Sequence, residues 1–146
     1  MLRDILNRNL VKAEPNASVI EIAQLMTEHN VGAVLIARDG KPLGIVTDRD
    51  IVIRCLAEDV DFRQCKVEDI MTDSVETCRE TDGIFDCIQK MRKSKVRRMP
   101  VIDPDGRAIG IISFGDLLAV LSKEFHELIS TTTPAEDIEQ LGEFAA

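Results

Sequence analysis

The chain contains one pattern of residues twice, and this internal repeat restricts its possible folds more than any other feature of the sequence. A shift of 65 positions, followed by one inserted residue and a shift of 66, aligns identical residues on each other. The aligned residues of the first copy are Asp4, Ile5, Gln24, Met26, Val31, Ile36, Asp39, Gly40, Gly44, Ile45 and Asp50. Chance matches would not keep this order and spacing across a glycine, a turn and an acid. The sequence therefore predicts two copies of one structural unit.

Each copy begins with a predicted amphipathic helix. Four apolar residues of the first copy recur at the i, i+3, i+4, i+7 spacing that places side chains on one helical face: Val19, Ile22, Ala23 and Met26. Ser18 stands at the N-cap position, and Glu21 three residues later completes the pattern of a capping box. The second copy repeats the apolar stripe at Ile84, Cys87, Ile88 and Met91.

A β-hairpin and a second helix follow the first helix in both copies. Short apolar runs at residues 33–36 and 43–46 flank an Asp-Gly pair, and the runs at 99–102 and 109–112 repeat the arrangement. The second helices are expected at about residues 49–57 and 115–128. Residues 10–11 and 75–76 resemble a short strand ahead of each first helix. Each copy is therefore predicted to be a β-α-β-β-α unit.

A unit of about 60 residues is marginal as an independent domain, because it buries too little apolar surface alone. Two units are expected to share one core, packed sheet to sheet about a pseudo-twofold axis, in the α/β fold class (α+β type). We place the first repeat at residues 1–60 and the second repeat at residues 66–122, with a connector at 58–65. Residues 123–146 are predicted to form a helical tail, with a short acidic helix at 135–144. That helix would carry three apolar residues on one side: Ile138, Leu141 and Phe144.

Composition narrows the classes of function. Aromatic residues make up 3% of the chain, with no Trp or Tyr, which argues against platforms that stack sugars or single-stranded bases. The formal charge of -8 disfavours nucleic acid and anionic lipid as partners. The chain has no apolar run of membrane-spanning length, and residues 1–10 are too charged for a secretory signal. We therefore expect a cytoplasmic protein without a membrane or nucleic-acid partner.

The four cysteines, at positions 55, 65, 78 and 87, have no CxxC spacing. A zinc site or a disulfide pair would be the functional interpretation. Reduced, mostly buried thiols are the expected state in a reducing compartment, and we favour this interpretation. Cys87 lies within the apolar stripe of its helix, where an inert core thiol belongs.

Each hairpin ends in a hydroxyl residue that is followed three positions later by an acid: Thr47 with Asp50, and Ser113 with Asp116. As local structure, these pairs are N-caps with a carboxylate near the helix dipole. As a binding site, the helix N-terminus and the hydroxyl suit a phosphate, and the carboxylate suits the hydroxyls of a ribose. The duplication favours a nucleotide site without excluding the caps. Asp48 and Asp50 have few other hard ligands nearby, so no metal site is expected.

The sequence resembles a tandem pair of CBS domains, the cystathionine β-synthase-type regulatory module. The resemblance rests on residues 67–72 (VEDIMT), residues 96–103 (VRRMPVID) and the two Gly-h-h-[Ser/Thr]-x-x-Asp segments at 44–50 and 110–116, where h is apolar. It covers nearly everything from Leu2 to Leu121. It implies β-α-β-β-α units packed by their sheets, with clefts that bind adenosine-containing ligands. AMP, ADP, ATP, NAD and S-adenosylmethionine all occur in the family, and no obligatory cofactor is expected.

The resemblance also implies roles for individual residues. Asp50 and Asp116 would hold ribose hydroxyls, while Thr47 and Ser113 would meet phosphate. The first-strand segments would lie against the adenine through backbone groups and apolar side chains: Val11, Lys12 and Ala13 in the first repeat, and Val75, Glu76 and Thr77 in the second. Aliphatic walls of this kind are compatible with a chain that lacks Trp and Tyr.

Two arginines, Arg97 and Arg98, match positions where members of the family place phosphate-contacting basic residues. They enter a strand that we expect to be buried, where unpaired guanidinium groups would be costly, and this favours an anion as their partner. The other cations of the stretch are expected to be solvated. The first repeat has Gly32 in the place of Arg98, so the two clefts are expected to be unequal.

We therefore expect a stand-alone regulatory protein that binds an adenine nucleotide (AMP, ADP, ATP or NAD(H)) between its repeats and passes occupancy to an unknown partner. An enzyme is not expected, because His29 and His126 lie in helical segments away from the duplicated acids. A homodimer is expected to bury apolar residues of the second helices: Ile51, Val52 and Leu56, or Leu117, Leu118 and Leu121. One alternative is a ligand-free interaction module that acts through the acidic tail. Nucleic-acid binding through residues 90–98 is the least favoured alternative.

Overall fold

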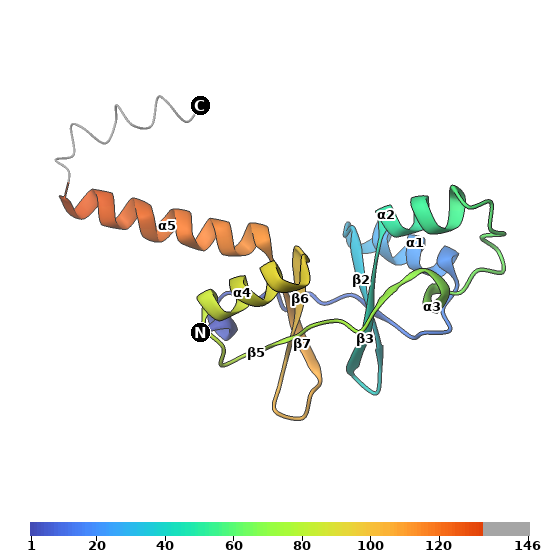
Figure 1. Ribbon diagram of the computed structural model, residues 1–146, viewed down its shortest axis with the longest axis horizontal. Helices are drawn as coiled ribbons and strands as arrows, with labels where there is room; N and C mark the ends of the chain where they lie inside the picture. Colours follow the sequence, from blue (N-terminus) through green and yellow to red (C-terminus); the bar gives the residue numbers. More distant parts are fainter. Residues whose placement is uncertain (133–146) are drawn as a thin grey trace. The chain divides into compact units, whose positions relative to one another are not determined.

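The computed structural model describes residues 1–132, which fall into two compact units (Figure 1). The first unit, residues 1–112, carries two β-sheets and their helices. The second unit begins at Ser113 and is described through the long helix α5 (Phe114–Thr132). The acidic helix expected at 135–144 lies outside the described residues. No helix among residues 1–132 is both long and apolar enough to cross a membrane.

The first sheet has the strand order β1-β2-β3-β4, with the strands β1 (Lys12–Ala13), β2 (Ala33–Arg38), β3 (Lys41–Thr47) and β4 (Thr72–Asp73). The antiparallel pair β2–β3 is the predicted hairpin. Asp39 and Gly40 in its turn have φ angles of 53° and 79°, which an Asp-Gly pair adopts readily. The helical elements of the first repeat are η1 (Leu2–Asp4), α1 (Val19–His29), α2 (Asp48–Asp50) and the π-helical turn η2 (Ile51–Leu56).

The second sheet has the strand order β5-β6-β7, with the strands β5 (Cys78–Arg79), β6 (Arg98–Ile102) and β7 (Ala108–Ser113). Helix α4 (Ile84–Ser94) accompanies this sheet, whereas the short helix α3 (Val67–Ile70) packs against the first sheet. Cys87 and Met91 of α4 are buried, which confirms the predicted apolar stripe. The α1 and α4 helices both follow a two-residue strand that pairs in parallel with the hairpin. The repeated sequence therefore folds into repeated structure.

Strand β2 is buried on both faces, because it lies between the two halves of the first unit. Val34 and Ile36 belong to the core that α1 covers. Leu35 and Ala37, which point to the opposite face, pack with Ala108 of β7. The expected packing of sheet against sheet is thus present, and it explains the continuous apolar run of this strand.

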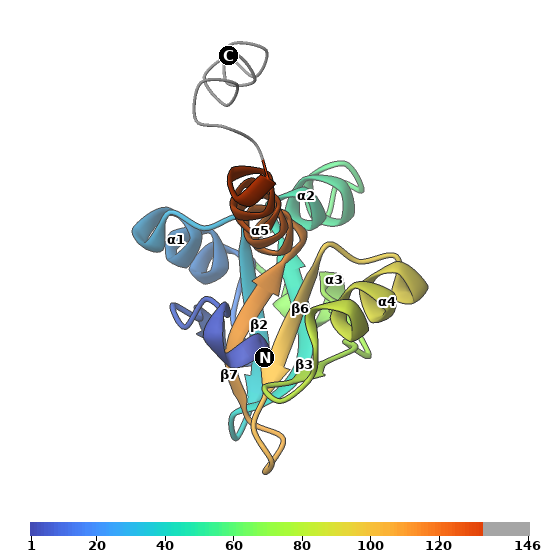
Figure 2. The same cartoon turned by 90° about the vertical axis from the view of Figure 1, so that its left-hand side faces the viewer.

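The segment that leads into each repeat crosses to the sheet of the other repeat. In one crossing, β4 pairs with β3, and α3 packs Val67 into the first core. In the other, Asn7 forms a bridge to Ile111, and the N-terminus lies beside the second sheet (Figure 2). This reciprocal exchange joins the two repeats far more tightly than sheet packing alone would.

Two glycines at equivalent positions permit these crossings. A Cβ atom on Gly44 would lie 2.8 Å from the carbonyl oxygen of Thr72, and one on Gly110 would lie 2.7 Å from that of Asn7. Backbone atoms cannot approach a real side chain so closely. The glycine of each Gly-h-h-[Ser/Thr]-x-x-Asp segment is therefore required by the crossing chain and not by its own torsion angles.

The structure corrects several element boundaries. The first strands lie at Lys12–Ala13 and Cys78–Arg79 instead of residues 10–11 and 75–76, because the parallel register with β2 and β6 selects the pairing residues. The second helix of the first repeat starts one residue early and is wound as a π-helix from Ile51. Helix α5 continues past residue 128, where the hydroxyls of Ser130 and Thr131 donate to carbonyls one turn earlier.

Candidate functional site

A cleft with a volume of about 270 Å³ opens in the first unit beside the C-terminal end of β3. Three separate segments form it: the end of the first hairpin with α2, the chain from β4 onward, and the loop between α4 and β6. The lining residues are Ile45, Thr47, Asp50, Thr72, Asp73, Ser74, Val75, Glu76, Ser94, Val96, Arg97 and Arg98. The first repeat thus contributes the hydroxyl and its acid, and the second repeat contributes the arginines.

The cleft brings together six of the residues singled out from the sequence: Thr47, Asp50, Val75, Glu76, Arg97 and Arg98. The other predicted binding residues lie elsewhere. Thr77 and the segment 11–13 do not line this cleft, and Val11 and Ala13 pack against the first core. Ser113 and Asp116 belong to the second unit.

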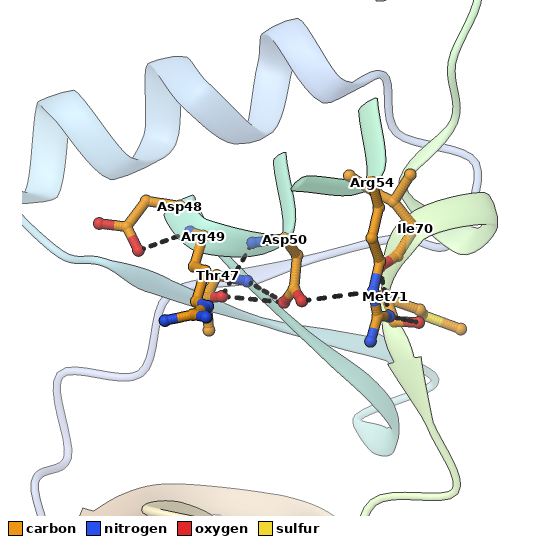
Figure 3. A network of polar contacts seen from close by, with 7 residues as sticks. All are labelled: Thr47, Asp48, Arg49, Asp50, Arg54, Ile70 and Met71. Atoms are coloured by element: carbon orange, nitrogen blue, oxygen red, sulfur yellow. Dashed lines mark hydrogen bonds and ion pairs between the residues drawn. The ribbon is translucent and has the colours of Figure 1, made fainter. Parts of the chain in front are cut away.

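Thr47 and Asp50 form a complete capping box (Figure 3). The Thr47 amide and hydroxyl both donate to Asp50 Oδ2, at 2.8 and 2.9 Å. The Asp50 amide donates in return to the Thr47 hydroxyl at 3.2 Å. The interpretation of this pair as a helix cap is therefore confirmed. The cap also leaves Asp50 Oδ1 on the edge of the carboxylate that Thr47 does not use.

The cap restricts how Thr47 could take part in ligand binding. Its single hydroxyl proton is directed to Asp50 Oδ2, so the hydroxyl cannot donate to a phosphate without first releasing that contact. Asp50 is better prepared, because an ionised carboxylate only accepts hydrogen bonds and Oδ1 can accept from a ligand hydroxyl. The geometry therefore favours a hydroxyl-bearing ligand group at Asp50.

Asp50 also has a cationic neighbour that the sequence reading did not identify. Arg54 Nε lies 3.6 Å from Asp50 Oδ1, and Arg54 Nη1 donates to the carbonyl oxygens of Ile70 and Met71 at 2.9 and 3.2 Å (Figure 3). The spacing of four residues on a helix was the available signal for this ion pair. The contact to the Ile70 and Met71 carbonyls had no such signal, because it joins segments far apart in the sequence.

Ser113 and Asp116, described on their own in the second unit, have the same geometry as Thr47 and Asp50. The Ser113 amide and hydroxyl donate to Asp116 Oδ2, both at 2.7 Å, and the Asp116 amide donates to the hydroxyl at 3.1 Å. The repeat is therefore preserved at the level of individual hydrogen bonds. The residue four positions after Asp116 is Val120, so this acid has no counterpart of Arg54 on its own helix.

The burial expected for Arg97 and Arg98 is wrong, because both residues are exposed. The buried part of β6 starts at Met99, and the chain ahead of it lies at the mouth of the cleft. An anion is therefore not needed to offset the cost of buried guanidinium groups. The two arginines still place positive charge on the cleft, which the carboxylates of Asp50, Asp73 and Glu76 also line.

The sequence reading missed several other residues of the cleft: Ile45, Asp73, Ser74, Ser94 and Val96. Ser74 has a φ angle of 53°, which turns the chain out of β4 and along the cleft. This turn explains why residues 75–76 line the cleft instead of pairing in a sheet. Thr72, another lining residue, ends the motif at 67–72, which could have directed attention to this wall.

The four cysteines are free thiols and all are buried, as expected. Burial raises the pKa of the Cys65 thiol to about 11, and a hydrogen bond from the Cys78 thiol to Cys87 raises the pKa of Cys78. Both groups are therefore protonated near neutral pH. Within residues 1–132, no group of three or more His, Cys, Asp and Glu side chains is placed to hold a metal ion.

Comparison with known families agrees with this geometry. The model of the CBS domain matches residues 2–56 and 67–123, which together make up most of the chain. An uncharacterized protein of Methanopyrus kandleri, MK0525, is 31% identical over 118 residues, which cover 80% of this chain and 60% of that protein. Hypoxic response protein 1 of Mycobacterium tuberculosis is 34% identical over 116 residues, or 79% of this chain and 80% of that protein.

A solved structure extends the comparison to ligands. The CBS domain pair of protein MJ0100, in complex with 5'-methylthioadenosine and S-adenosyl-L-methionine, is 30% identical to this chain with a TM-score of 0.75. The match covers 85% of this chain and 97% of that chain. Both ligands of that relative contain one adenosine.

Proposed function

The chain belongs to the CBS-domain family, and we propose that it is a regulatory protein whose cleft binds an adenine nucleotide. The observation that carries this proposal is the grouping of Asp50 with Arg97 and Arg98 in one cleft, from segments almost 50 residues apart. A carboxylate for ribose hydroxyls and guanidinium groups for phosphate are the two polar requirements of a nucleotide.

The cleft supplies a position for each part of the ligand. Asp50 Oδ1 accepts from the ribose hydroxyls, and Arg97 and Arg98 contact the phosphate. The aliphatic side chains of Ile45, Val75 and Val96 provide the apolar walls for the adenine ring, which replace aromatic stacking in this chain. Val11, Lys12, Ala13, Thr77, Ser113 and Asp116 are not among the lining residues of this cleft, and their binding roles stay predictions.

The size of the cleft favours a mononucleotide over NAD. Its volume of about 270 Å³ lies just below the range of ~300–1,000 Å³ that is typical of ligand pockets. Among the ligands expected from the sequence, AMP best combines one adenosine with a phosphate for the arginines. Both ligands in the MJ0100 complex likewise contain a single adenosine.

Isothermal titration calorimetry with AMP, ATP, NADH and 5'-methylthioadenosine tests the proposal. We expect Asp50→Asn, which keeps an oxygen for the cap, to weaken every adenosine ligand by about tenfold or more. The double variant Arg97→Gln/Arg98→Gln is expected to weaken AMP by about tenfold and to leave 5'-methylthioadenosine, which has no phosphate, nearly unchanged.

The matched control is Arg92→Gln/Lys93→Gln, which removes the same charge from exposed residues of α4 outside the cleft lining. It should retain the AMP affinity of the wild type. If none of the adenine compounds binds the wild type at millimolar concentration, the nucleotide function is wrong. Equal loss of AMP affinity in the control would instead mean that the arginines act only through general charge.

The proposal includes transmission of occupancy to a partner and assigns no catalytic step. Absence of phosphate release from ATP is the expected result of an activity assay.

A homodimer is supported by exposed apolar side chains in each unit: Val52 and Leu56 in the first, Leu118 and Leu121 in the second. Ile51 and Leu117, which we also expected at a dimer interface, are half-buried and buried. Light scattering of the purified protein tests the dimer.

The alternative, a ligand-free interaction module, depends on an acidic tail that lies outside the described residues. Deletion of residues 133–146 distinguishes the two. The interaction module is the better description if two results are found together. The deletion abolishes capture of a partner, and AMP neither binds nor affects the partner with the full chain or with the truncated chain.

A further inference from the structure

Arg54 does not line the cleft, but it contacts Asp50, which does, and the carbonyl groups of the two residues that precede the lining residues Thr72 and Asp73. Its Nε lies 3.6 Å from Asp50 Oδ1, on the hairpin side. Its Nη1 donates at 2.9 Å to the carbonyl oxygen of Ile70, on the side of the crossing chain (Figure 3). One guanidinium therefore spans the first repeat and the segment that enters the second.

The contact with Ile70 and Met71 satisfies carbonyl groups at the C-terminal end of α3. These groups have no partner within a helix, and a cation is favourable at this end. Thr72 and Asp73 follow at once, pair with β3 and line the cleft. Arg54 therefore anchors the two residues that directly precede the part of the cleft wall at residues 72–73.

The contact with Asp50 is made at the carboxylate oxygen that Thr47 does not use. Thr47 holds Oδ2 through two hydrogen bonds, and Arg54 is the cation beside Oδ1. A distance of 3.6 Å is too long for a strong hydrogen bond, so Oδ1 keeps its capacity to accept from a hydroxyl. The Asp50 side chain is only 16% exposed, which limits its freedom further.

We propose that Arg54 is a positioning residue for ribose recognition: it orients Asp50 Oδ1 toward the ribose hydroxyls and ties this orientation to the wall at residues 72–73. The inference rests on the proposed nucleotide function. It assigns ribose selectivity to this cleft in particular, because the repeat places Val120 at the position equivalent to Arg54.

The test compares AMP with 2'-deoxy-AMP in the full chain by calorimetry. We expect Arg54→Met to lose about tenfold in AMP affinity and far less in 2'-deoxy-AMP affinity, so that the preference for ribose falls. In the Asp50→Asn background, the same substitution should have little further effect, because Arg54 acts through Asp50. Arg54→Lys, which keeps the charge but lacks the planar fork, should restore only part of the preference.

The control is Arg63→Met in the connector, which removes the same charge from a side chain that stacks on Phe62. It should leave both affinities unchanged. Hydrogen exchange without ligand is a second readout: the amides of residues 70–73 should exchange faster in Arg54→Met, while those of α1 should not. This readout does not depend on nucleotide binding.

The outcomes separate this inference from the proposed function. If the wild type binds AMP and Arg54→Met keeps the preference for ribose, the positioning role is wrong and the nucleotide function stands. Additive losses in Arg54→Met and Asp50→Asn would also overturn the positioning role. If the wild type binds no adenine compound, the proposed function fails and the ribose role fails with it.

Discussion

The two repeats have the same fold but stabilise it differently at equivalent positions. Where α4 of the second repeat has Lys90 paired with Asp82 at 2.8 Å, the first repeat has Leu25 and Ala17, which pack against its core. The α1 helix starts with a side-chain cap from Ser18, whereas α4 starts at Gly83 without one. The apolar pattern and the crossing segments are therefore common to both repeats, while the polar contacts at the first helix of each repeat differ.

The positions that the repeats do not share also lie around the cleft. Arg98 is replaced by Gly32 in the first repeat, and Arg54 is replaced by Val120 in the second. Each repeat thus contributes what the other lacks. A duplicated chain can specialise one cleft in this way without changing its core.

The largest effect is expected where the repeats agree most closely, at the two crossing glycines. Gly44→Ala and Gly110→Ala should each lower the free energy of unfolding by about 2 kcal/mol, because the new methyl group meets a backbone carbonyl. Urea denaturation measures the change. The control is Gly115→Ala, whose Cβ would have its nearest neighbour at 3.5 Å and which should be unchanged or stabilised. Equal stability of all three variants would show that the crossings are not tightly packed.

The helix caps provide the next comparison. Ser18→Ala should cost about 1 kcal/mol, because the Ser18 hydroxyl accepts from the Glu21 amide at 3.2 Å and the Glu21 carboxylate accepts from the Ser18 amide at 2.7 Å. Hydrogen bonds from the Ser18 amide and the Ser18 hydroxyl to the Glu21 carboxylate lower the pKa of Glu21. The loss should therefore shrink as pH falls through the folded pKa, below the usual value of 4.5. A loss that stays constant to low pH would contradict the capping box.

The ion pair of the second repeat is expected to contribute less. Lys90→Met should cost roughly 0.5 kcal/mol near neutral pH, since the lysine is 39% exposed and solvent weakens the pair. Lys93→Met, on the exposed face of the same helix, is the matched control. Urea titrations of both variants measure the difference.

The pH dependence of this difference follows from the two partners. Lys90 holds the pKa of Asp82 below its usual 3.8, so the stabilisation is complete above that value and is lost as pH falls through the lower folded pKa. Asp82 raises the pKa of Lys90 above 10.5, so the stabilisation is complete below that value and is lost as pH rises through the higher folded pKa. A difference that persists at both extremes would mean that the contribution of Lys90 does not come from its ion pair with Asp82, but from its hydrogen bond to the Thr77 carbonyl oxygen or from the packing of its methylene groups.

The smallest effect is a gain. Gly83→Ser would give α4 the cap that α1 already has, and should stabilise the protein by about 0.3 kcal/mol. The φ angle of -77° at Gly83 suits any residue, although Asp86 Oδ2 must adjust because it would lie 3.2 Å from the new Cβ. A loss of stability would show that this adjustment costs more than the cap contributes.

The prediction from sequence was most accurate where the pattern is local and repeated. The Ser18 cap and the acid–hydroxyl pairs depend on neighbours within four residues, and each hairpin depends on a short turn between adjacent strands, so local spacing identified them. The two-residue strands β1 and β5 were misplaced, because so short a segment has no periodicity and its partner strand determines the register. Arg97 and Arg98 were expected to be buried because the boundary of β6 was not visible from composition.

The repeat by itself determined that this chain is two matched units with an acid and a hydroxyl at each hairpin end. Its spacing also determined that Val34 and Ile36 face one side of a strand while Leu35 and Ala37 face the other. Only the tertiary structure decided that Arg97 and Arg98 line the same cleft as Asp50, because that grouping depends on how the chain crosses from one repeat to the other. Arg54 illustrates the difference. Its ion pair with Asp50 follows from helical spacing, but its hydrogen bond to the Ile70 carbonyl oxygen forms only because α3 crosses to the first repeat.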